Sequence, residues 1–228
     1  MNAPSCPDDE AAAREEIVAA LRDLDARGLN RGSSGNLSLR WGAGCLITPT
    51  GMEATQITPC DLVWLGLDGK PRGHLRPSSE WHLHAALYRK RPALNAIVHT
   101  HAPYATALAC LRRDLPAFHY MVAVAGGDSV RCAPYHLFGT EALSAAVLQA
   151  MDDRLACLLA THGAVSAGAT LRQALKVMQE LESLCQSYLA ALAAGEPVLL
   201  TAAEMAEVIE KFRGYGQGPV AAAADDAG

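Results

Sequence analysis

Apolar residues recur at helical spacing in several parts of the chain. In the first of these stretches, Ile17, Val18, Leu21 and Leu24 form one stripe, and Gly28 follows as a stop signal. We expect helices over residues 9–27, 80–91, 103–111, 140–151, 170–193 and 201–213.

Short apolar runs lie between these helices, bounded by glycine-rich turns. Gly42-Ala43-Gly44 and Leu67-Asp68-Gly69 indicate hairpin turns, which join antiparallel strands. We expect strands over residues 37–40, 45–48, 62–65, 96–100, 118–125, 130–135 and 156–160. Interspersed strands and helices with several hairpins predict an α/β or α+β layered fold, in which helices flank a central, mostly antiparallel β-sheet.

Composition and charge narrow the class of protein. Of the 228 residues, 50% are hydrophobic, which is enough for a sizeable core, and the formal net charge is −5. Because there is no block of basic residues, we expect neither nucleic acid nor a membrane surface as a partner. The seven cysteines are scattered without a CxxC pair, and the first residues do not form a signal peptide. These features indicate reduced thiols and a cytoplasmic location.

The expected elements indicate a single domain over residues 9–215, preceded by a tail of residues 1–8. The chain after Gly216 is composed of small residues with little hydrophobic bulk, so we expect residues 216–228 to form a disordered C-terminal tail. No apolar run is long enough to span a bilayer.

The strand expected over residues 96–100 carries the first candidate for chemistry, His99 followed by His101. Alternate side chains of an extended chain face the same way, so the two imidazoles project together from Cα atoms about 6.5 Å apart. That span allows both rings to bind one metal ion. One buried and one solvent-facing histidine is the alternative, and the common HxH spacing leaves both interpretations open.

His162 is the candidate third ligand, because it follows the buried apolar strand over residues 156–160 and precedes Gly163, where the backbone can turn sharply. Three histidines at two strand ends would form the neutral ligand set usual for catalytic zinc. Taken alone, His162 is better explained as a surface histidine in a turn. His84 is a rival ligand, since it lies four residues after Glu80 and could face it on the helix. We rank it below His162, as a packed histidine that supports the site.

Glu80 lies in the first turn of the second helix, where the helix dipole favours a carboxylate and could by itself account for it. Ser78 or Ser79 can cap this helix, and their hydroxyls beside helix N–H groups suit an anion. Residues 33–36 and Thr50-Gly51 have a similar composition, so each loop could present hydroxyls and N–H groups to a phosphate. None matches a P-loop or a dinucleotide fingerprint, and singly each is explained as an ordinary turn.

Several short motifs follow one another in a recognisable order. They occupy residues 32–38, 46–51, 77–81, 98–101, 119–121, 125–127, 132–135, 138–140, 162–163 and 210–216. In this order they resemble the class II aldolases of the aldolase/adducin superfamily, and most of all the L-fuculose-1-phosphate aldolases. The resemblance spans about residues 9 to 216 with few gaps, which makes it a specific signal.

The resemblance implies a metal site, a phosphate pocket and contributions from a second subunit. One zinc ion per subunit would be held by His99, His101 and His162, with Glu80 as the fourth ligand. The substrate-binding residues would be Ser33, Ser34, Gly35, Asn36, Thr50, Gly51, Ser78 and Ser79, around the phosphate of dihydroxyacetone phosphate. Tyr120, Phe138 and Tyr215 would reach the site from a neighbouring subunit of a homotetramer, with the two tyrosines among the catalytic residues.

The implied activity is reversible retro-aldol cleavage of a ketose 1-phosphate, such as L-fuculose 1-phosphate. The products would be dihydroxyacetone phosphate and an aldehyde, formed through a metal-stabilised enediolate. Glu80 would act as the base on carbon, and Tyr120 would give a proton to the aldehyde oxygen.

Related activities stay open. The L-ribulose-5-phosphate 4-epimerases are similar but carry an aspartate where Glu80 stands, so Glu80 favours the aldolase. Other relatives cleave 5-deoxy or methylthio pentulose phosphates, or decarboxylate phosphorylated oxo-acids. A non-catalytic scaffold like the adducin head would be expected to have lost the three histidines and Glu80, and all four are present.

Overall fold

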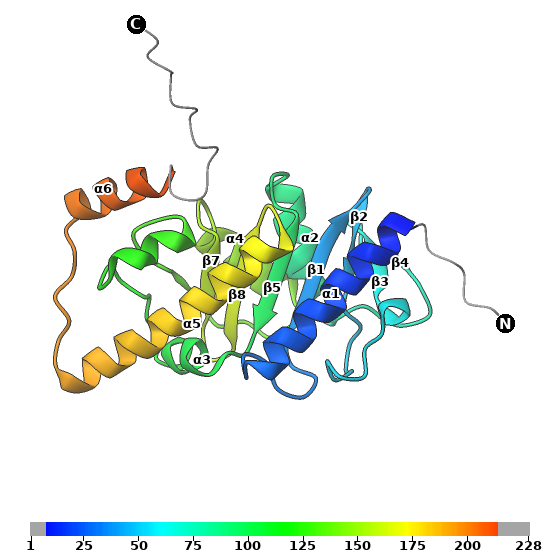
Figure 1. The fold of residues 1–228 in the computed structure, drawn as a ribbon, viewed down its shortest axis with the longest axis horizontal. Helices are drawn as coiled ribbons and strands as arrows, with labels where there is room; N and C mark the ends of the chain where they lie inside the picture. Colours follow the sequence, from blue (N-terminus) through cyan, green and yellow to red (C-terminus); the bar gives the residue numbers. More distant parts are fainter. Residues whose placement is uncertain (1–7, 214–228) are drawn as a thin grey trace, which may run out of the picture.

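The computed structural model describes residues 8–213 and contains one eight-stranded sheet with helices on both faces (Figure 1). The strands are β1 Asn36–Trp41, β2 Gly44–Ile47, β3 Val63–Gly66, β4 Pro71–Arg72, β5 Ala96–Thr100, β6 Cys132–Ala133, β7 Ala156–Leu159 and β8 Gly163–Gly168. Their order in the sheet is β4-β3-β2-β1-β5-β8-β7-β6. Neighbouring strands are antiparallel apart from β6 and β7. The expected mostly antiparallel sheet is confirmed.

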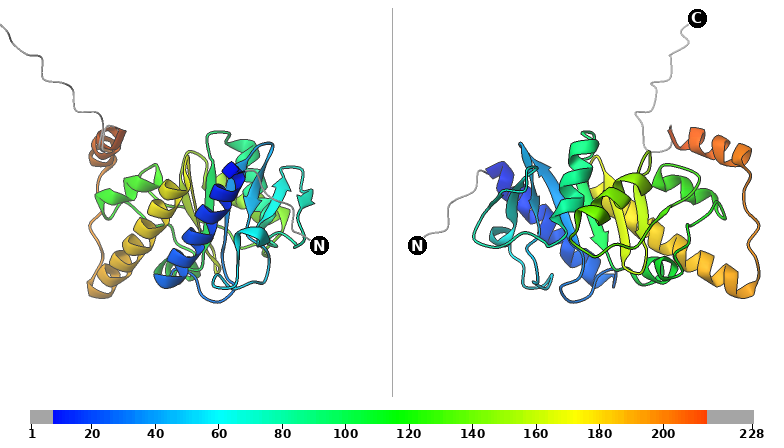
Figure 2. Two further views of the ribbon diagram at one scale, coloured as in Figure 1. Left: turned by 45° about the vertical axis from the view of Figure 1, so that its right-hand side comes forward. Right: turned by 180° about the vertical axis from the view of Figure 1, so that it is seen from behind.

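Helices cover the two faces of the sheet. They are α1 Asp8–Ala26, α2 Trp81–Lys90, α3 Pro103–Cys110, α4 Glu141–Ala150, α5 Leu171–Ala194 and α6 Ala202–Arg213, with 3₁₀ helices η1 Pro59–Asp61 and η2 Tyr120–Ala125. Helices α1, α3 and α5 pack on one face, while α2 and α4 pack on the other (Figure 2).

Strand β5 shows how the sequence divides the two cores. Ala96 and Val98 belong to the core under α1 and α5, whereas Ile97 belongs to the core under α2 and α4. Because side chains alternate along a strand, His99 shares the face of Ile97. The alternation therefore directs His99 toward the side on which α2 begins.

The expected strand over residues 118–125 is wrong, because Tyr120–Ala125 form the 3₁₀ helix η2. Its backbone groups bond locally, with the N–H of Val122 donating to the carbonyl of His119 at 3.1 Å. Of the strand expected over residues 130–135, only Cys132–Ala133 pair in the sheet. Short apolar runs do not distinguish a strand from a buried turn of helix by pattern alone.

Strand β8 was not expected from the sequence, although it lies between β5 and β7. Its residues are glycine, alanine, valine and serine, which lack the bulk that marks most strands. The small residues suit close packing against α5, where the hydroxyl of Ser166 donates to the carbonyl of Ala174 at 2.8 Å. Tertiary packing, rather than local preference, makes this segment a strand.

The start of α2 also differs from expectation. Glu80 is the N-cap residue, so neither Ser78 nor Ser79 caps the helix. The Ser78 hydroxyl instead accepts from the N–H of Glu80 at 3.3 Å. This contact fixes the backbone at the residue whose carboxylate faces the sheet.

No helix in residues 8–213 is both long and apolar enough to cross a membrane. The six cysteines in this range are free. The expected N-terminal tail, Tyr215 and the expected C-terminal tail lie outside the described residues.

Candidate active site

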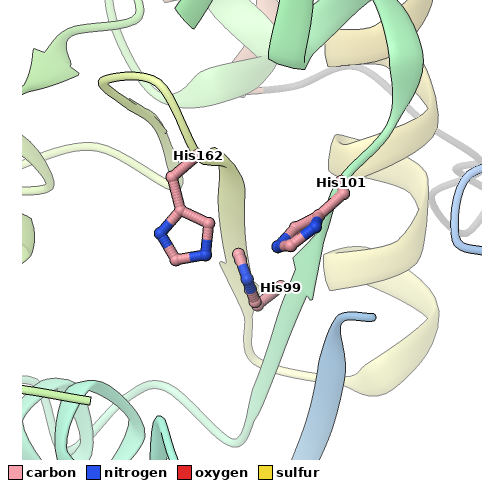
Figure 3. Close-up of side chains that lie close together, drawn as sticks. All are labelled: His99, His101 and His162. Carbon is pink, nitrogen blue, oxygen red and sulfur yellow. The ribbon is translucent and has the colours of Figure 1, made fainter. Parts of the chain in front are cut away.

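Three histidine side chains meet where β5 ends and β8 begins (Figure 3). His99 is on β5, His101 follows that strand, and His162 precedes β8. Because Thr100 pairs with Ala164, the turn that carries His162 lies beside the end of β5. One ring nitrogen from each histidine lies within 4.8 Å of the others. The structure thus brings together the three histidines that the sequence predicts as ligands.

The turn between β7 and β8 is shaped for this approach. A methyl group at Gly163 would overlap the carbonyl oxygen of Thr100 and press on the ring of His101. Thr161 has a φ of +55°, a conformation that costs a β-branched residue energy. Its N–H donates to the carbonyl of Ala109 at 3.0 Å. Steric fit and this hydrogen bond together fix the residue that precedes His162.

His99 is oriented by the strand beside it. Its Nδ1–H donates to the carbonyl oxygen of Ala164 at 2.9 Å. Since a carbonyl can only accept, Nδ1 carries the proton, and in the neutral ring the lone pair is left on Nε2. A backbone partner of this kind sets the tautomer of a metal-binding histidine.

Glu80 closes the group from the N-terminus of α2. Its Oε2 lies 3.1 Å from Nε2 of His99, and its Oε1 lies 3.4 Å from Nε2 of His162. The side-chain amide of Asn36 donates to Oε2 at 3.0 Å. The residue is only 7% exposed, so this carboxylate is held in a largely dry environment.

The unsatisfied atoms show that a cation fits this site. Oε1 of Glu80, Nε2 of His99 and Nε2 of His101 are buried and make no hydrogen bond with any described residue. Where Nε2 of neutral His99 meets Oε2 of Glu80 at 3.1 Å, two acceptors face each other without a proton between them. Buried polar atoms are rarely left unpaired, because each costs free energy unless something binds it. Three imidazoles and a carboxylate are the donor set of a divalent metal site.

The protonation states agree with metal binding. Burial and the neighbouring His99 lower the pKa of His162 to about 4, and burial with both neighbouring histidines lowers that of His101 to about 4. Burial alone would raise the pKa of Glu80, but the histidines and Asn36 outweigh it and hold that pKa well below its usual range. The same attraction raises the pKa of His99 despite its burial. Neutral His101 and His162 beside an ionised Glu80 are the protonation states in which these side chains bind a metal ion.

His84 is not part of this group. Its Nε2 lies 2.6 Å from Oδ1 of Asn36, and its Nδ1 lies 2.7 Å from the hydroxyl of Ser38. Burial lowers the pKa of His84 to about 3, so the ring is neutral. His84 therefore contacts Asn36, which in turn contacts Glu80, in agreement with its ranking below His162.

The metal-site residues open onto a cavity of about 550 Å³. The cavity is lined by Ser33, Ser34, Gly35, Asn36, Pro49, Thr50, Gly51, Ser78, Ser79, Glu80, His101, Tyr135, His136, Phe138, Thr161 and His162. All three small-residue loops identified in the sequence are in this set. No lysine or arginine is among these lining residues, so the available anion donors are hydroxyls, backbone N–H groups and the side chains of Asn36 and the lining histidines.

The aromatic residues expected from a second subunit fall into three cases. Phe138 lines the cavity of its own chain and is 60% exposed. Tyr120 lies on η2, is 50% exposed and does not line this cavity. Tyr215 lies outside the described residues.

Tyr135, His136 and Thr161 also line the cavity, although the sequence reasoning assigns none of them to the site. Tyr135 ends one of the motifs that carry the resemblance, and Thr161 precedes a candidate ligand. These two positions in the sequence could have indicated that Tyr135 and Thr161 belong to the site. His136 had no such signal, because its loop has no regular pattern that ties it to the three histidines.

Known proteins resemble this chain in both sequence and fold. Residues 15–189 match the family described as Class II Aldolase and Adducin N-terminal domain. A 5-methylthioribulose-1-phosphate/5-deoxyribulose-1-phosphate aldolase from Rhodospirillum rubrum is 48% identical over 210 residues, which cover 92% of this chain and 95% of the relative. An L-fuculose phosphate aldolase from Escherichia coli strain K12 is 44% identical over 202 residues, covering 88% and 94%. A solved structure of an L-fuculose 1-phosphate aldolase matches with a TM-score of 0.86 at 38% identity, covering 91% of this chain and 98% of that one.

Proposed function

The chain belongs to the class II aldolase and adducin family, and on that premise we propose that it is a metal-dependent aldolase that cleaves a ketose or pentulose 1-phosphate. One observation carries the proposal. The unpartnered Oε1 of Glu80 and three histidines with converging nitrogens lie together at a cavity lined with hydroxyls. A non-catalytic scaffold gives no reason to keep such atoms buried and unpaired.

Zinc is the proposed metal, because neutral imidazoles with one carboxylate are its usual catalytic ligands. His99, His101 and His162 would hold it, with Glu80 as the fourth ligand before substrate binds. When bound, it would supply Lewis-acid polarisation of the substrate carbonyl.

Glu80 is the proposed base on the carbon next to that carbonyl. Its lowered pKa keeps the carboxylate ionised and therefore able to accept a proton. Asn36 donates to Oε2, while Oε1 has no hydrogen-bond partner. Oε1 is thus the oxygen free to take the proton, and Oε2 is the one that holds the side chain in position.

The phosphate would bind in the loops of residues 33–36, Thr50-Gly51 and Ser78-Ser79. These line one cavity together with Glu80. In the absence of lysine or arginine from the lining, the anion would be recognised by donors of fixed geometry rather than by a mobile positive charge. Such a site rejects the unphosphorylated ketone, whose binding would leave the donors unpaired.

Dihydroxyacetone phosphate is the proposed common product, and the aldehyde is the part that distinguishes the candidate substrates. L-Fuculose 1-phosphate, which would yield L-lactaldehyde, is the first candidate. The relative from Rhodospirillum rubrum favours a second candidate, a methylthio or 5-deoxy pentulose phosphate. Phe138 and Tyr135, both exposed and at the cavity, offer apolar surface to either tail.

A homotetramer is the proposed assembly, with Tyr120 and Tyr215 serving a neighbouring subunit's site. The exposure of Tyr120 and its absence from the lining of its own cavity support this arrangement. A head-to-tail ring interface would let each subunit give one surface and receive the other.

Product analysis tests the function directly. Purified zinc-loaded enzyme is incubated with dihydroxyacetone phosphate together with one aldehyde at a time: L-lactaldehyde, glycolaldehyde or methylthioacetaldehyde. A further incubation contains L-ribulose 5-phosphate alone. Formation of a ketose 1-phosphate supports the proposal, and the relative rates identify the aldehyde. Conversion of L-ribulose 5-phosphate to its 4-epimer with no carbon–carbon bond cleavage would instead favour the epimerase. No reaction with any of them would contradict the aldolase.

A further inference from the structure

We propose that His84 is a positioning residue that locks the direction of a buried hydrogen-bond chain ending on Glu80, and thereby keeps one particular oxygen of that carboxylate free. The inference rests on the proposed function only in that Glu80 is taken as the base. The direction of the chain is a separate property that can be measured without turnover.

Two elements supply alternating members of the chain. Helix α2 gives Glu80, His84 and Tyr88, which are four residues apart and so share one helix face. Strand β1 gives Asn36 and Ser38, which are two residues apart and share one strand face. Each is at most 7% exposed. The chain is thus buried between the helix and the sheet, and only its Glu80 end, with Asn36, borders the cavity.

The distances connect these five residues without a gap. Asn36 Nδ2 lies 3.0 Å from Glu80 Oε2, and Asn36 Oδ1 lies 2.6 Å from His84 Nε2. His84 Nδ1 lies 2.7 Å from the Ser38 hydroxyl, which lies 2.8 Å from the hydroxyl of Tyr88. Every contact is within hydrogen-bond range.

The carboxylate end fixes the direction of the first links. An ionised carboxylate can only accept, so Asn36 must turn its NH₂ group toward Glu80. Its carbonyl oxygen then faces His84 and can only accept. Nε2 of His84 must therefore carry a proton and donate.

The remaining links follow from the neutral ring. An imidazolium here would be buried with no carboxylate in direct contact, so His84 is neutral and Nδ1 is an acceptor. Ser38 must donate its proton to Nδ1, which leaves its oxygen to accept from Tyr88. The other acceptor near Tyr88, the carbonyl of Asn95, is farther away at 3.3 Å. The protons of Ser38, His84 and Asn36 thus all point toward Glu80.

This direction matters because an asparagine amide can flip. If the Asn36 amide were reversed while His84 kept its proton on Nε2, the NH₂ group of Asn36 would face that N–H, donor against donor. At the other end, the carbonyl oxygen of Asn36 would face Oε2 of Glu80, acceptor against acceptor. His84 therefore keeps Asn36 donating to Oε2, also after Glu80 has taken up a proton. The other oxygen, Oε1, remains the one without a hydrogen bond.

Nitrogen NMR of the zinc-loaded, ¹⁵N-histidine-labelled enzyme tests the direction. The His84 signals are assigned by their loss in His84→Gln. We expect a pyrrole-type Nε2 that carries hydrogen and a pyridine-type Nδ1 that does not. A protonated Nδ1 in the wild-type enzyme would overturn the proposal, whether or not the protein proves to be an aldolase.

Variants of His84 test the consequence for Glu80. A glutamine can still donate to Asn36 from its amide nitrogen and accept from Ser38 through its oxygen, whereas a methionine of similar bulk can do neither. We expect His84→Met to slow the exchange of dihydroxyacetone phosphate protons with solvent deuterium by about 10- to 100-fold in kcat, with KM and zinc content retained. His84→Gln should recover most of that rate.

Leu87→Met is the matched control, because Leu87 is equally buried in α2 and belongs to the apolar core. It should exchange at the wild-type rate. Wild-type exchange by zinc-loaded His84→Met would overturn the positioning role, as would equal losses in His84→Met and His84→Gln. If the wild-type enzyme itself catalyses no exchange, the proposed function fails, and the NMR result still decides the direction of the chain.

Discussion

Asn36 lies directly opposite His99 in the antiparallel register of β1 and β5, and its side-chain amide donates to Glu80 at 3.0 Å. The register of β1 and β5 thus fixes the distance between His99, a candidate metal ligand, and Asn36, which holds the candidate base Glu80. A shift by one residue would turn Asn36 to the opposite face. The site is therefore as rigid as the sheet that carries it.

Metal removal should abolish activity. Dialysis against a chelator is expected to inactivate the enzyme and added zinc to restore it, because the proposed Lewis acid would be lost. Nε2 of His101 has no hydrogen-bond partner among the described residues. His162→Ala should lose stoichiometric zinc as measured by mass spectrometry. His74→Ala, whose side chain is 62% exposed, is the control and should keep it. Full activity in a metal-free preparation would contradict the proposed class of enzyme.

Replacement of the proposed base should separate binding from proton transfer. Glu80→Gln is expected to fold but to slow exchange between dihydroxyacetone phosphate and deuterated solvent by about 10²–10⁴-fold, the usual contribution of a general base. The exchange is followed by proton NMR and needs no aldehyde. Wild-type exchange in this variant would assign the base to another residue.

A single methyl group at the β7–β8 turn should disturb the metal site. In Gly163→Ala the added methyl would overlap the carbonyl of Thr100, so we expect a loss of about 1–3 kcal/mol in the free energy of unfolding. Zinc affinity should fall as well, because the same methyl presses on His101.

Gly195→Ala is the control for this substitution, since its methyl would meet nothing within 4 Å. Its effect should stay within about 0.5 kcal/mol. Denaturant unfolding and zinc titration measure both variants. Equal behaviour of the two would show that position 163 tolerates a side chain.

Loss of a hydroxyl from the cavity should weaken phosphate binding. Thr50→Val keeps the shape of the side chain but removes its hydroxyl, and Ser79→Ala does the same for a second loop. Each is expected to raise KM for dihydroxyacetone phosphate by about 10- to 100-fold, because a hydrogen bond to a charged group contributes about 1.5–3 kcal/mol. Zinc content should not change.

Ser183→Ala, an exposed serine on α5, is the control and should leave KM unchanged. Free dihydroxyacetone serves as the comparison substrate for all three variants. If it reacts as well as its phosphate, the three loops are ordinary turns.

Mixing of two inactive variants should restore activity if a neighbouring subunit contributes Tyr120. Tyr120→Phe and Glu80→Gln are each expected to be nearly inactive alone. After refolding together in equal amounts, roughly a quarter of the sites should pair an intact Glu80 with an intact Tyr120 from the next chain, by random assembly in a closed ring. Mixed oligomers without activity would mean that Tyr120 does not act across the subunit interface.

The sequence by itself determined the parts of this protein that depend on local pattern. The stripe of Ile17, Val18, Leu21 and Leu24 specified α1, and all four are buried. The short, partly β-branched run of residues 96–100 specified β5. Alternation along that strand put His99 and His101 on one face. The HxH spacing predicted His99 and His101 as a pair, because spacing within one strand is a local property. His162 was predicted from its place after the buried run of residues 156–160 and from the resemblance.

Only the tertiary structure decided the rest. Strand β8 is built of small residues that no strand pattern marks, and it exists because β5, β7 and α5 surround it. The link from His84 through Asn36 to Glu80 joins residues 48 and 44 positions apart. Such contacts arise from the register of β1 with β5 and the packing of α2 on that sheet. A pattern along the chain shows which side chains share one face of a helix or strand. Which of these faces contact each other depends on the packing of the whole fold.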